Sequence, residues 1–381
     1  MIDKHAGEAE IIGGGFKAIN CVMSIARQVG ARKLSASVCS NNAFKACAFG
    51  IGGQRGGLLS EHSNRDEICN RNIRAQLSDH RAPIPPQIFQ QNSLAELRQL
   101  SGKQPEELGR LSPPLYKAPG ADRYELIDND RALRLTGEKM RATHPSRSFF
   151  YGSGRSSNEA AYLLHLFARV YGCNHINSCS YYCHQASGIG PSATVGNGAA
   201  TIRYADLHAA DTIFVFGANP ASNHPRFVKV QLECRQLGGK VIVVNPAREA
   251  GPVRFASPAN FRSMIAGGGE VASHCVQPHV GGDVAFIVGV AKCLLGNNAV
   301  ESPFIKQHTE SFGAHHDFVE QIQWQDIVRE SGVDQETIVE ISKIFQASQE
   351  TVMAWGMGLI HHNNGSENIE AVIALALLRG W

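Results

Sequence analysis

Three short apolar runs, separated by helical stretches, constrain the fold of this chain more than any other feature. The runs are TIFVFG at 212–217, KVIVVNP at 240–246 and TVMAWGMG at 351–358. Apolar residues recur at helical spacing in PRFVKVQLECRQLGG (225–239), DVAFIVGVAKCLLG (283–296), DQETIVEISKIFQAS (334–348) and SENIEAVIALALLRGW (366–381). Strands that alternate with helices predict an α/β fold with a doubly wound, mostly parallel sheet and right-handed crossovers.

The same alternation begins near residue 147. RSFFYGSG (147–154) is typical of a buried strand, and SNEAAYLLHLFARVYG (157–172) of a helix with Ser157 as its N-cap and Gly172 at its end. Residues 1–145 differ, because glycine-rich and proline-rich stretches predict long loops and short elements there. We therefore expect two parts: an irregular N-terminal region, 1–145, and α/β cofactor-binding domains, 146–381.

Charge and hydropathy exclude several classes of partner. The formal net charge of +2 gives no electrostatic footprint for nucleic acid. No apolar run approaches the roughly 20 residues that span a bilayer, so we expect no membrane insertion. The first residues lack a basic segment followed by an apolar one, which predicts a cytoplasmic protein. Ten cysteines in such a chain are not expected to form a disulfide framework.

The turns that follow the predicted strands suit a nucleotide-like ligand, because open α/β sheets bind ligands at the carboxyl ends of their strands. Four such turns lie at 152–159, 217–225, 245–251 and 355–365. Arg155 or Arg248 can pair with a phosphate, and Glu159 or Glu249 can accept a hydrogen bond from a ribose or a guanine. Ordinary turn chemistry is the alternative, and GSGRSS lacks the third glycine of a dinucleotide fingerprint.

CSYYCHQASGIG (179–190) is predicted to be a loop, and it places Cys183 beside His184. The thiol can be a buried hydrophobe, a nucleophile, a zinc ligand or a ligand of a heavier metal. A zinc site from Cys179, Cys183 and His184 has a spacing that does not fit the usual ligand pairs. The residues alone leave these alternatives open.

The stretch CHQASGIGPSATVGNGAATIRYADLHAADTIFVFGANPASNHP (183–225) resembles the catalytic subunit of molybdopterin-dependent formate dehydrogenases. It is more similar still to the formate-dehydrogenase-like oxidoreductase alpha subunits of bacteria. The pairs and turns that carry the resemblance are Cys183-His184, VGNG (195–198), FGANPASNHP (216–225), GSGRSSNEA (152–160), VVNPARE (243–249) and WGMGLIHH (355–362). The resemblance spans roughly residues 35 to 381 and implies an incomplete molybdopterin oxidoreductase fold.

The resemblance implies that Cys183 is a ligand of molybdenum or tungsten, whose other sulfur ligands come from bis-molybdopterin guanine dinucleotide. A soft thiolate suits such a site, and His184 is expected to accept or relay a proton. The implied reaction is the two-electron oxidation of formate or a similar small substrate. The implied cofactor-binding residues are Gly154, Arg155, Ser156, Asn158, Glu159, Gly217, Asn219, Pro220, His224, Asn245, Pro246, Arg248, Gln277, Gly282, Asp283, Gly356, Met357, Gly358 and His361.

The family's N-terminal [4Fe–4S] cluster is the first point of departure. Phe44 stands where a cluster cysteine is expected, which leaves Cys47, Cys69 and the irregularly spaced Cys39 as candidate iron–sulfur ligands. Buried thiols are the alternative for all three. Arg71 also replaces a lysine that the family places between the cluster and the pterin.

Length is the second departure, since members of the family are much longer than this chain. We therefore expect the N-terminal half of such an enzyme, with the final helix (366–381) leaving an exposed hydrophobic patch. The expected partners are the missing C-terminal half or an electron-transfer protein. A non-catalytic nucleotide-binding module is the competing hypothesis, and a domain for a different dinucleotide is the third.

Overall fold

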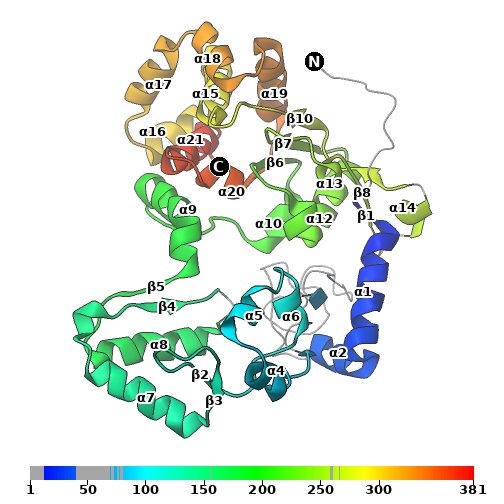
Figure 1. Ribbon diagram of the computed structural model, residues 1–381. Helices are drawn as coiled ribbons and strands as arrows, with labels where there is room; N and C mark the ends of the chain where they lie inside the picture. Colours follow the sequence, from blue (N-terminus) through cyan, green and yellow to red (C-terminus); the bar gives the residue numbers. More distant parts are fainter. Residues whose placement is uncertain are drawn as a thin grey trace.

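The computed structural model describes residues 13–39, 69, 73–74, 77, 80–154, 156–257, 261–265 and 267–381. A parallel four-stranded sheet in the order β10-β7-β6-β11 forms its centre (Figure 1). The strands are β6 (Thr212–Phe216), β7 (Lys240–Val244), β10 (His274–Val276) and β11 (Thr351–Trp355). Phe214 of β6 lies opposite Ile242 and Met353 of its two neighbours. The predicted α/β class with parallel strands is confirmed.

Strand β6 is buried along its whole length because helices cover both faces of the sheet. Ile213 and Val215 face α10 (Tyr204–Ala209) and α12 (Pro225–Gln236), where Phe227 and Val230 complete a core. On the opposite face Phe214 and Phe216 stack with ring centroids 5.7 Å apart. This second core is built from α15 (Asp283–Gly296), α19 (Gln335–Ala347) and α21 (Gly365–Leu378).

The final helix, α21, is covered, which corrects the expectation of an exposed patch there. Ile369, Val372, Leu375 and Leu378 are each at most 3% exposed. They join the core that α15 and α19 form, and α21 also packs along α9 (Cys179–Val195). Full burial of an aliphatic side chain contributes about 1.5–3 kcal/mol, so this helix is anchored firmly in the described chain.

A second, smaller unit lies apart from the central sheet in Figure 1. Strands β4 (Phe150–Gly152) and β5 (Ile176–Ser178) pair in parallel, and α8 (Asn158–Tyr171) connects them. The predicted caps of α8 are confirmed: the Ser157 hydroxyl accepts from the Ala160 N–H, and Gly172 ends the helix in the left-handed region. The turn after β4 therefore belongs to this pair of strands, and only three of the four predicted turns share the edge of the central sheet.

The N-terminal region is more helical than its composition suggests. It contains α1 (Gly15–Val29), α2 (Ala31–Cys39) and α7 (Asn129–Arg141), which is capped by the Asp128 carboxylate. The shorter elements are α4 (Pro86–Gln91), α5 (Leu94–Arg98), α6 (Gln104–Glu107), the 3-10 turn η1 (Pro145–Arg147) and the antiparallel pair β2 (Leu115–Tyr116) and β3 (Glu125–Leu126). The domain boundary at 145 stays a prediction.

A three-stranded sheet, β1-β8-β9, joins the start of the described chain to its middle. Its strands are β1 (Gly13–Gly14), β8 (Arg254–Ala256) and β9 (Gly269–Glu270). The remaining helices are α11 (Pro220–Asn223), α13 (Ala250–Val253), α14 (Phe261–Ile265), α16 (Ser302–His308), α17 (Phe312–Gln321), α18 (Trp324–Ser331) and α20 (Met357–Ile360). Among the described residues no helix has the length and apolar character that crossing a bilayer requires.

Candidate functional site at the carboxyl ends of the central strands

Three glycine-containing turns meet where the central strands end. The Gly217 N–H donates to the Val244 carbonyl at 2.9 Å, and the Gly356 N–H donates to the Phe216 carbonyl at 2.9 Å. The Gly358 N–H returns to the Gly217 carbonyl, also at 2.9 Å. The turns after β6, β7 and β11 are thus linked by backbone hydrogen bonds into one continuous edge.

Gly217 is required at this edge by its conformation and its surroundings. Its φ is +53°, a region that residues with a Cβ rarely adopt. A Cβ there would lie 2.5 Å from the Leu359 nitrogen and 2.7 Å from the Gly358 carbonyl carbon. Because both are backbone atoms, they cannot move aside as a flexible side chain could. The backbones of the β6 and β11 turns therefore pack so closely at Gly217 that only glycine fits there.

The segment that was predicted to be a loop around Cys183 is helical in the structure. It forms α9, which is interrupted at His184, where φ is −125° and ψ is 21°. Glycines within this stretch suggested a loop, but Gly190 lets the helix pack closely on α21, since a Cβ there would lie 2.8 Å from Ile369. The interruption separates the first turn of α9, which holds Cys183, from the part that packs on α21.

Cys183 lies at the edge of the central sheet rather than inside a core. Its side chain is partly buried, and its Sγ lies 3.6 Å from the Sδ of Met357 at the start of α20. The His361 ring donates from Nε2 to the Cys183 carbonyl oxygen at 3.0 Å. One helical turn further on, the Trp355 indole donates to the Ser187 hydroxyl at 2.8 Å. These contacts join two predicted site residues, Met357 and His361, to the predicted metal ligand.

His184 and His224 face the same region from different elements. His184 is exposed, and His224 lies between α11 and α12, where its N–H donates to the Pro220 carbonyl at 2.7 Å. Desolvation by the surrounding protein lowers the pKa of His224, and the positive charge of His184 lowers it further. The Asn219 carboxamide accepts from the Ser222 N–H and so begins α11. Asn219 and Pro220 thus shape the turn by local capping.

The turn after β7 presents an acceptor that nothing in the described chain satisfies. The Glu249 Oε2 atom is buried and has no hydrogen-bond partner among the described residues. Nearby, the Gln277 amide donates to the Pro246 carbonyl at 3.0 Å, and the Asn245 N–H donates to the Val276 carbonyl at 2.9 Å. Arg248 is exposed in the same turn. A buried carboxylate oxygen without a donor costs free energy, so this turn suits a ligand that carries N–H groups.

Gly282 and Asp283 begin α15 after β10. A Cβ at Gly282 would lie 2.6 Å from the Glu330 carbonyl oxygen, so this glycine permits contact with α18. Asp283 is 5% exposed, and desolvation raises the pKa of its carboxyl while the charge of His362 opposes the rise. His362 itself donates to the Gly358 carbonyl at 2.6 Å.

The predicted residues near β4 lie on the smaller unit. The Gly154 N–H donates to the Cys179 sulfur at 2.9 Å, so Cys179 is used in holding this turn. Ser156 and Asn158 are exposed at the start of α8. A hydrogen bond from its own backbone N–H, followed by one from the Ser157 hydroxyl, lowers the pKa of Glu159. Arg155 lies outside the described residues.

The candidate iron–sulfur cysteines do not meet in the described residues. Cys69 is 4% exposed and packs with Ile25, Leu34 and Ile73, whereas Cys39 is exposed at the end of α2. Cys47, Phe44 and Arg71 lie outside the residues that the structure describes. Across the described ranges, no three His, Cys, Asp or Glu side chains gather as a protein-built metal site would require.

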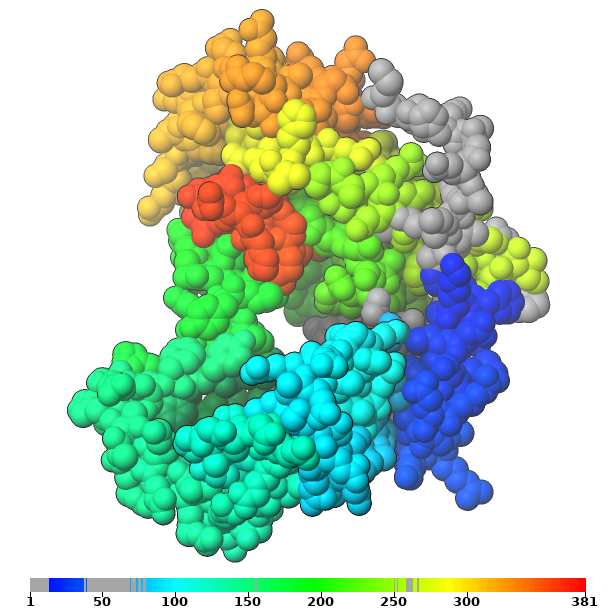
Figure 2. Space-filling model, viewed as in Figure 1, coloured from blue at the N-terminus to red at the C-terminus, as the bar shows by residue number. Residues whose placement is uncertain are grey.

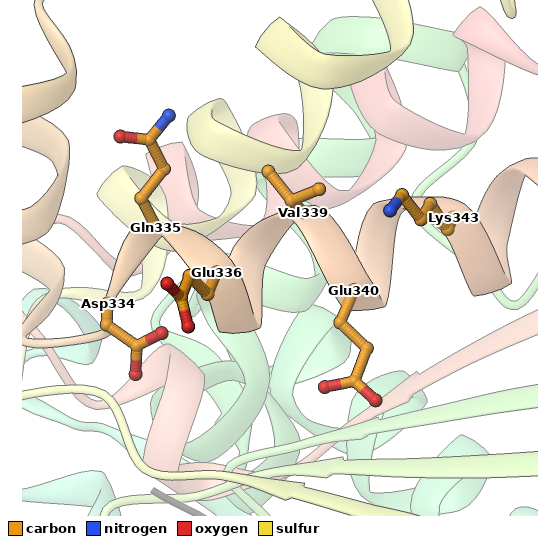
Figure 3. Close-up of a pocket in the computed structure, with 6 residues that line it drawn as sticks. All are labelled: Asp334, Gln335, Glu336, Val339, Glu340 and Lys343. Carbon is orange, nitrogen blue, oxygen red and sulfur yellow. The ribbon is translucent and has the colours of Figure 1, made fainter.

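A groove elsewhere on the surface contains none of the predicted residues. It runs along α19 and is lined by Asp334, Gln335, Glu336, Val339, Glu340 and Lys343 (Figure 3). Two glutamates and a lysine lie on the outward face of α19, which is an ordinary solvated helix face. The candidate site therefore remains the edge of the central sheet.

The predicted site residues omit three contributors to that edge: Trp355, Ser187 and His362. Trp355 and His362 nevertheless lie within the stretch 355–362 that carries the resemblance. Ser187 lies in the part of α9 beyond the interruption at His184, and the stretch was predicted to be a loop, so no helical register pointed to it. Trp355 ends a predicted strand, but the sequence offers no sign of its partner on α9.

This arrangement defines a doubly wound α/β protein whose candidate ligand site is the edge at the carboxyl ends of its parallel strands. A family model described as molybdopterin oxidoreductase matches residues 110–381. The chain belongs to the molybdopterin oxidoreductase family, and membership implies a molybdopterin cofactor with molybdenum or tungsten.

Relatives of established and unestablished activity match the same chain. An uncharacterised oxidoreductase of Mycobacterium tuberculosis is 32% identical over 322 residues, which are 82% of this chain and 41% of that protein. Formate dehydrogenase H of Escherichia coli is 26% identical over 277 residues, 71% of this chain and 36% of that protein. The chain thus spans well under half the length of these relatives.

Among solved structures, acetylene hydratase from Pelobacter acetylenicus has a similar fold. The TM-score is 0.57 at 17% identity, over 71% of this chain and 35% of that one. At this identity the likeness supports the fold alone.

Proposed function

We propose that this chain forms the cofactor-binding part of a formate-dehydrogenase-like oxidoreductase, with Cys183 as the protein ligand of molybdenum or tungsten. The observation that carries the proposal is the position of the Cys183 sulfur. It lies beside Met357 at the carboxyl edge of the sheet, partly open to solvent, and not within the apolar core. A reactive or ligating thiol needs that access, whereas an inert thiol is enclosed.

The residues present fit a bis-molybdopterin guanine dinucleotide in two respects. The unsatisfied Glu249 oxygen after β7 matches the N–H donors of a guanine. The linked backbone turns at Gly217 and Gly356 form a compact edge with no side chains at those two positions. In this proposal Asn245, Pro246, Arg248 and Gln277 surround one guanine, and Gly356, Met357, Gly358 and His361 lie nearest the metal end.

When bound, the metal and its pterins supply the two-electron redox chemistry. Oxidation of formate to carbon dioxide releases one proton and two electrons. His184, next to the ligand Cys183 and exposed to the site, accepts the proton. Desolvation lowers the pKa of His224, which makes this ring a weaker proton acceptor, so we assign the proton to His184 and not to His224. The electrons pass to a partner that the proposal places in the cytoplasm.

The proposal does not include an iron–sulfur cluster on the described cysteines. Cys69 is enclosed by Ile25, Leu34 and Ile73, and Cys39 is exposed elsewhere on α2. A cubane needs four ligands held together. In this proposal the electron acceptor therefore belongs to another polypeptide or to a segment outside the described residues.

Elemental analysis tests the proposal. The chain is expressed anaerobically with excess molybdate and assayed for molybdenum, released guanine nucleotide and the sulfur coordination of the metal by X-ray absorption. We expect close to one metal per chain, and Cys183→Ser should remove one sulfur from the metal's shell. Cys179→Ser is the matched control. Cys179 lies on the same helix as Cys183, but its sulfur accepts a hydrogen bond from the Gly154 N–H.

The outcomes separate the candidate functions. Guanine nucleotide without metal would support the competing non-catalytic binding module. If the protein carried neither metal nor guanine nucleotide, the proposal would be overturned. A metal whose coordination is unchanged in Cys183→Ser would remove Cys183 from the site. With metal bound, turnover of formate against other small oxidisable substrates then tests the substrate.

A further inference from the structure

The first turn of α9, residues 179–183, contains Cys183 but is separated from the rest of its helix. The interruption at His184, where φ is −125° and ψ is 21°, breaks the helical backbone directly after Cys183. Beyond it, α9 packs on α21 through Gly190, where a Cβ would lie 2.8 Å from Ile369. An interrupted helix does not fix the direction of one part from the position of the other, so contacts outside α9 must place the first turn.

The smaller unit holds this turn from one side. Helix α9 begins at Cys179, immediately after β5 ends at Ser178, so no linker separates the turn from the β4-β5 pair. The Gly154 N–H, in the turn after β4, donates to the Cys179 sulfur at 2.9 Å. In Figure 1 α9 runs from the end of β5 toward α20 and α21. Figure 2 shows the smaller unit (blue-green to green) set apart from the body that contains the central sheet, with a narrower green segment between them.

Three tyrosine rings, hereafter the tyrosine cluster, add a second contact between the smaller unit and the turn. The ring centroid of Tyr151, on β4, lies 6.2 Å from that of Tyr182, the residue before Cys183. Tyr181 meets Tyr182 edge to face at 5.4 Å. The Gln185 amide, from the far side of the interruption, donates to the Tyr181 hydroxyl at 3.2 Å. The tyrosine cluster thus extends from β4, across the turn, to the second part of α9.

The central sheet holds the turn from the other side. The His361 ring donates to the Cys183 carbonyl oxygen at 3.0 Å, and the Met357 sulfur lies 3.6 Å from the Cys183 sulfur. The first contact fixes a backbone atom, and a contact between a thiol and a thioether has little directional preference. Rotation of the turn about these two contacts is therefore restrained by the smaller unit.

We infer that Tyr151 is a positioning residue for Cys183. Through Tyr182 it holds the first turn of α9 so that the Cys183 sulfur lies against Met357 at the edge of the central sheet. Both rings are about half exposed, so they restrain the turn from outside the two cores of the central sheet. As a statement about metal ligation the inference rests on the proposed function. The position of the thiol itself can be measured without any metal.

Thiol labelling of the full chain tests the inference. The protein is produced without molybdate or tungstate and treated with iodoacetamide, and the labelling rate of each cysteine is followed by peptide mass spectrometry. Cys183 is partly buried beside Met357, so a loosened turn exposes its sulfur more often. For Tyr151→Ala we expect Cys183 to label about three to ten times faster, the change that loss of one aromatic pair permits. Cys39, which is exposed on α2, should keep its rate.

Three further variants separate positioning through Tyr182 from a general loosening. Tyr151→Phe keeps the ring and should label at the wild-type rate. Tyr162→Ala removes a ring that is 66% exposed on α8 of the same unit, outside the tyrosine cluster, and should also leave the Cys183 rate unchanged. Tyr182→Ala should label faster, and combining it with Tyr151→Ala should give no further increase, because both changes remove the same contact.

Three results would overturn the inference: an unchanged Cys183 rate in Tyr151→Ala, an equal increase in Tyr162→Ala, or independent effects of Tyr151→Ala and Tyr182→Ala. An increase at Cys39 as large as that at Cys183 would count against it equally, since the whole chain would then have loosened. If Tyr151→Ala lowers the melting temperature, Tyr151→Leu takes its place with the same expected increase.

The labelling results and the proposed function can fail separately. Because no metal is present during labelling, the rates report on the position of the Cys183 thiol alone. A protein without metal in the earlier assay would overturn the proposed function and leave these rates as expected. Unchanged rates would remove Tyr151 as a positioning residue and leave Cys183 as the proposed ligand.

Discussion

Replacing Gly217 by alanine should destabilise the fold at the candidate site far more than the same change at a glycine with open space. Both Gly217 and Gly238 have positive φ, +53° and +88°. A Cβ at Gly238 meets nothing within 4 Å, whereas one at Gly217 lies 2.5 Å from the Leu359 nitrogen. Gly238→Ala therefore isolates the conformational cost, and Gly217→Ala adds the collision with the β11 turn.

The magnitudes follow from those distances. An alanine in the left-handed region costs about 1–2 kcal/mol. Overpacking against atoms that cannot relax costs about a further 1–3 kcal/mol. Moving the turns apart instead would break the hydrogen bond from the Gly358 N–H to the Gly217 carbonyl, worth about 1 kcal/mol. We expect about 2–5 kcal/mol for Gly217→Ala and about 1–2 kcal/mol for Gly238→Ala.

Urea unfolding measures the difference. Trp355 lies at the end of β11 and reports on this edge through its indole fluorescence. For a denaturant slope near 3 kcal/mol per molar, the midpoint should fall by roughly 0.7–1.7 M for Gly217→Ala and by roughly 0.3–0.7 M for Gly238→Ala. Equal shifts in the two variants would refute the argument that the β6 and β11 turns are in closest contact.

Three other changes test separate contacts. His361→Ala should speed hydrogen exchange in the first turn of α9, because the ring no longer donates to the Cys183 carbonyl, and His361→Gln should restore part of the protection. Asp211→Asn should lower stability at neutral pH. Burial alone would raise the pKa of Asp211, but hydrogen bonds from the Ser348 hydroxyl and backbone N–H groups outweigh it and lower the pKa. The depressed pKa means that the stabilisation is present above about pH 4 and is lost as the pH falls further. An equal difference in unfolding free energy between wild type and variant at pH 3 and at pH 7 would contradict this. Ser157→Ala should cost about 1 kcal/mol, seen as faster exchange of the α8 amides.

Three of the four strands of the central sheet, β6, β7 and β11, could be predicted because their apolar runs have the length and the flanking residues of buried parallel strands. The fourth, β10 (His274–Val276), was missed because three residues form no recognisable apolar run. The run at 351–358, for example, yields β11 and then the Gly356 turn, as expected. The turns at 217, 245 and 356 also meet as predicted, since the carboxyl ends of parallel strands share one edge. The turn after β4 does not join them, because nothing in its local sequence reveals that β4 pairs with β5 in a separate sheet.

Helix α9 could not be predicted because its stability comes from tertiary contacts. Gly188, Gly190 and Pro191 all lower intrinsic helix propensity. The close approach of Gly190 to Ile369 and the hydrogen bond from Trp355 to Ser187 supply what local preference lacks. Both partners lie more than 160 positions away along the chain, beyond the reach of any local pattern.

The predicted exposed patch on the final helix was wrong for a related reason, since tertiary contacts again decide the outcome. Helices α8 and α21 both carry apolar residues at helical spacing, and sequence periodicity cannot tell which of them finds a partner within the chain. Leu375 of α21 is 1% exposed because α21 joins a core on a four-stranded sheet, while Leu163 of α8 is 62% exposed over a two-stranded one. The number of strands under a helix decides how many neighbouring helices can flank it. The apolar side chains of α8 thus stay exposed over a sheet that has two strands in the described residues, which the periodicity of α8 alone could not reveal.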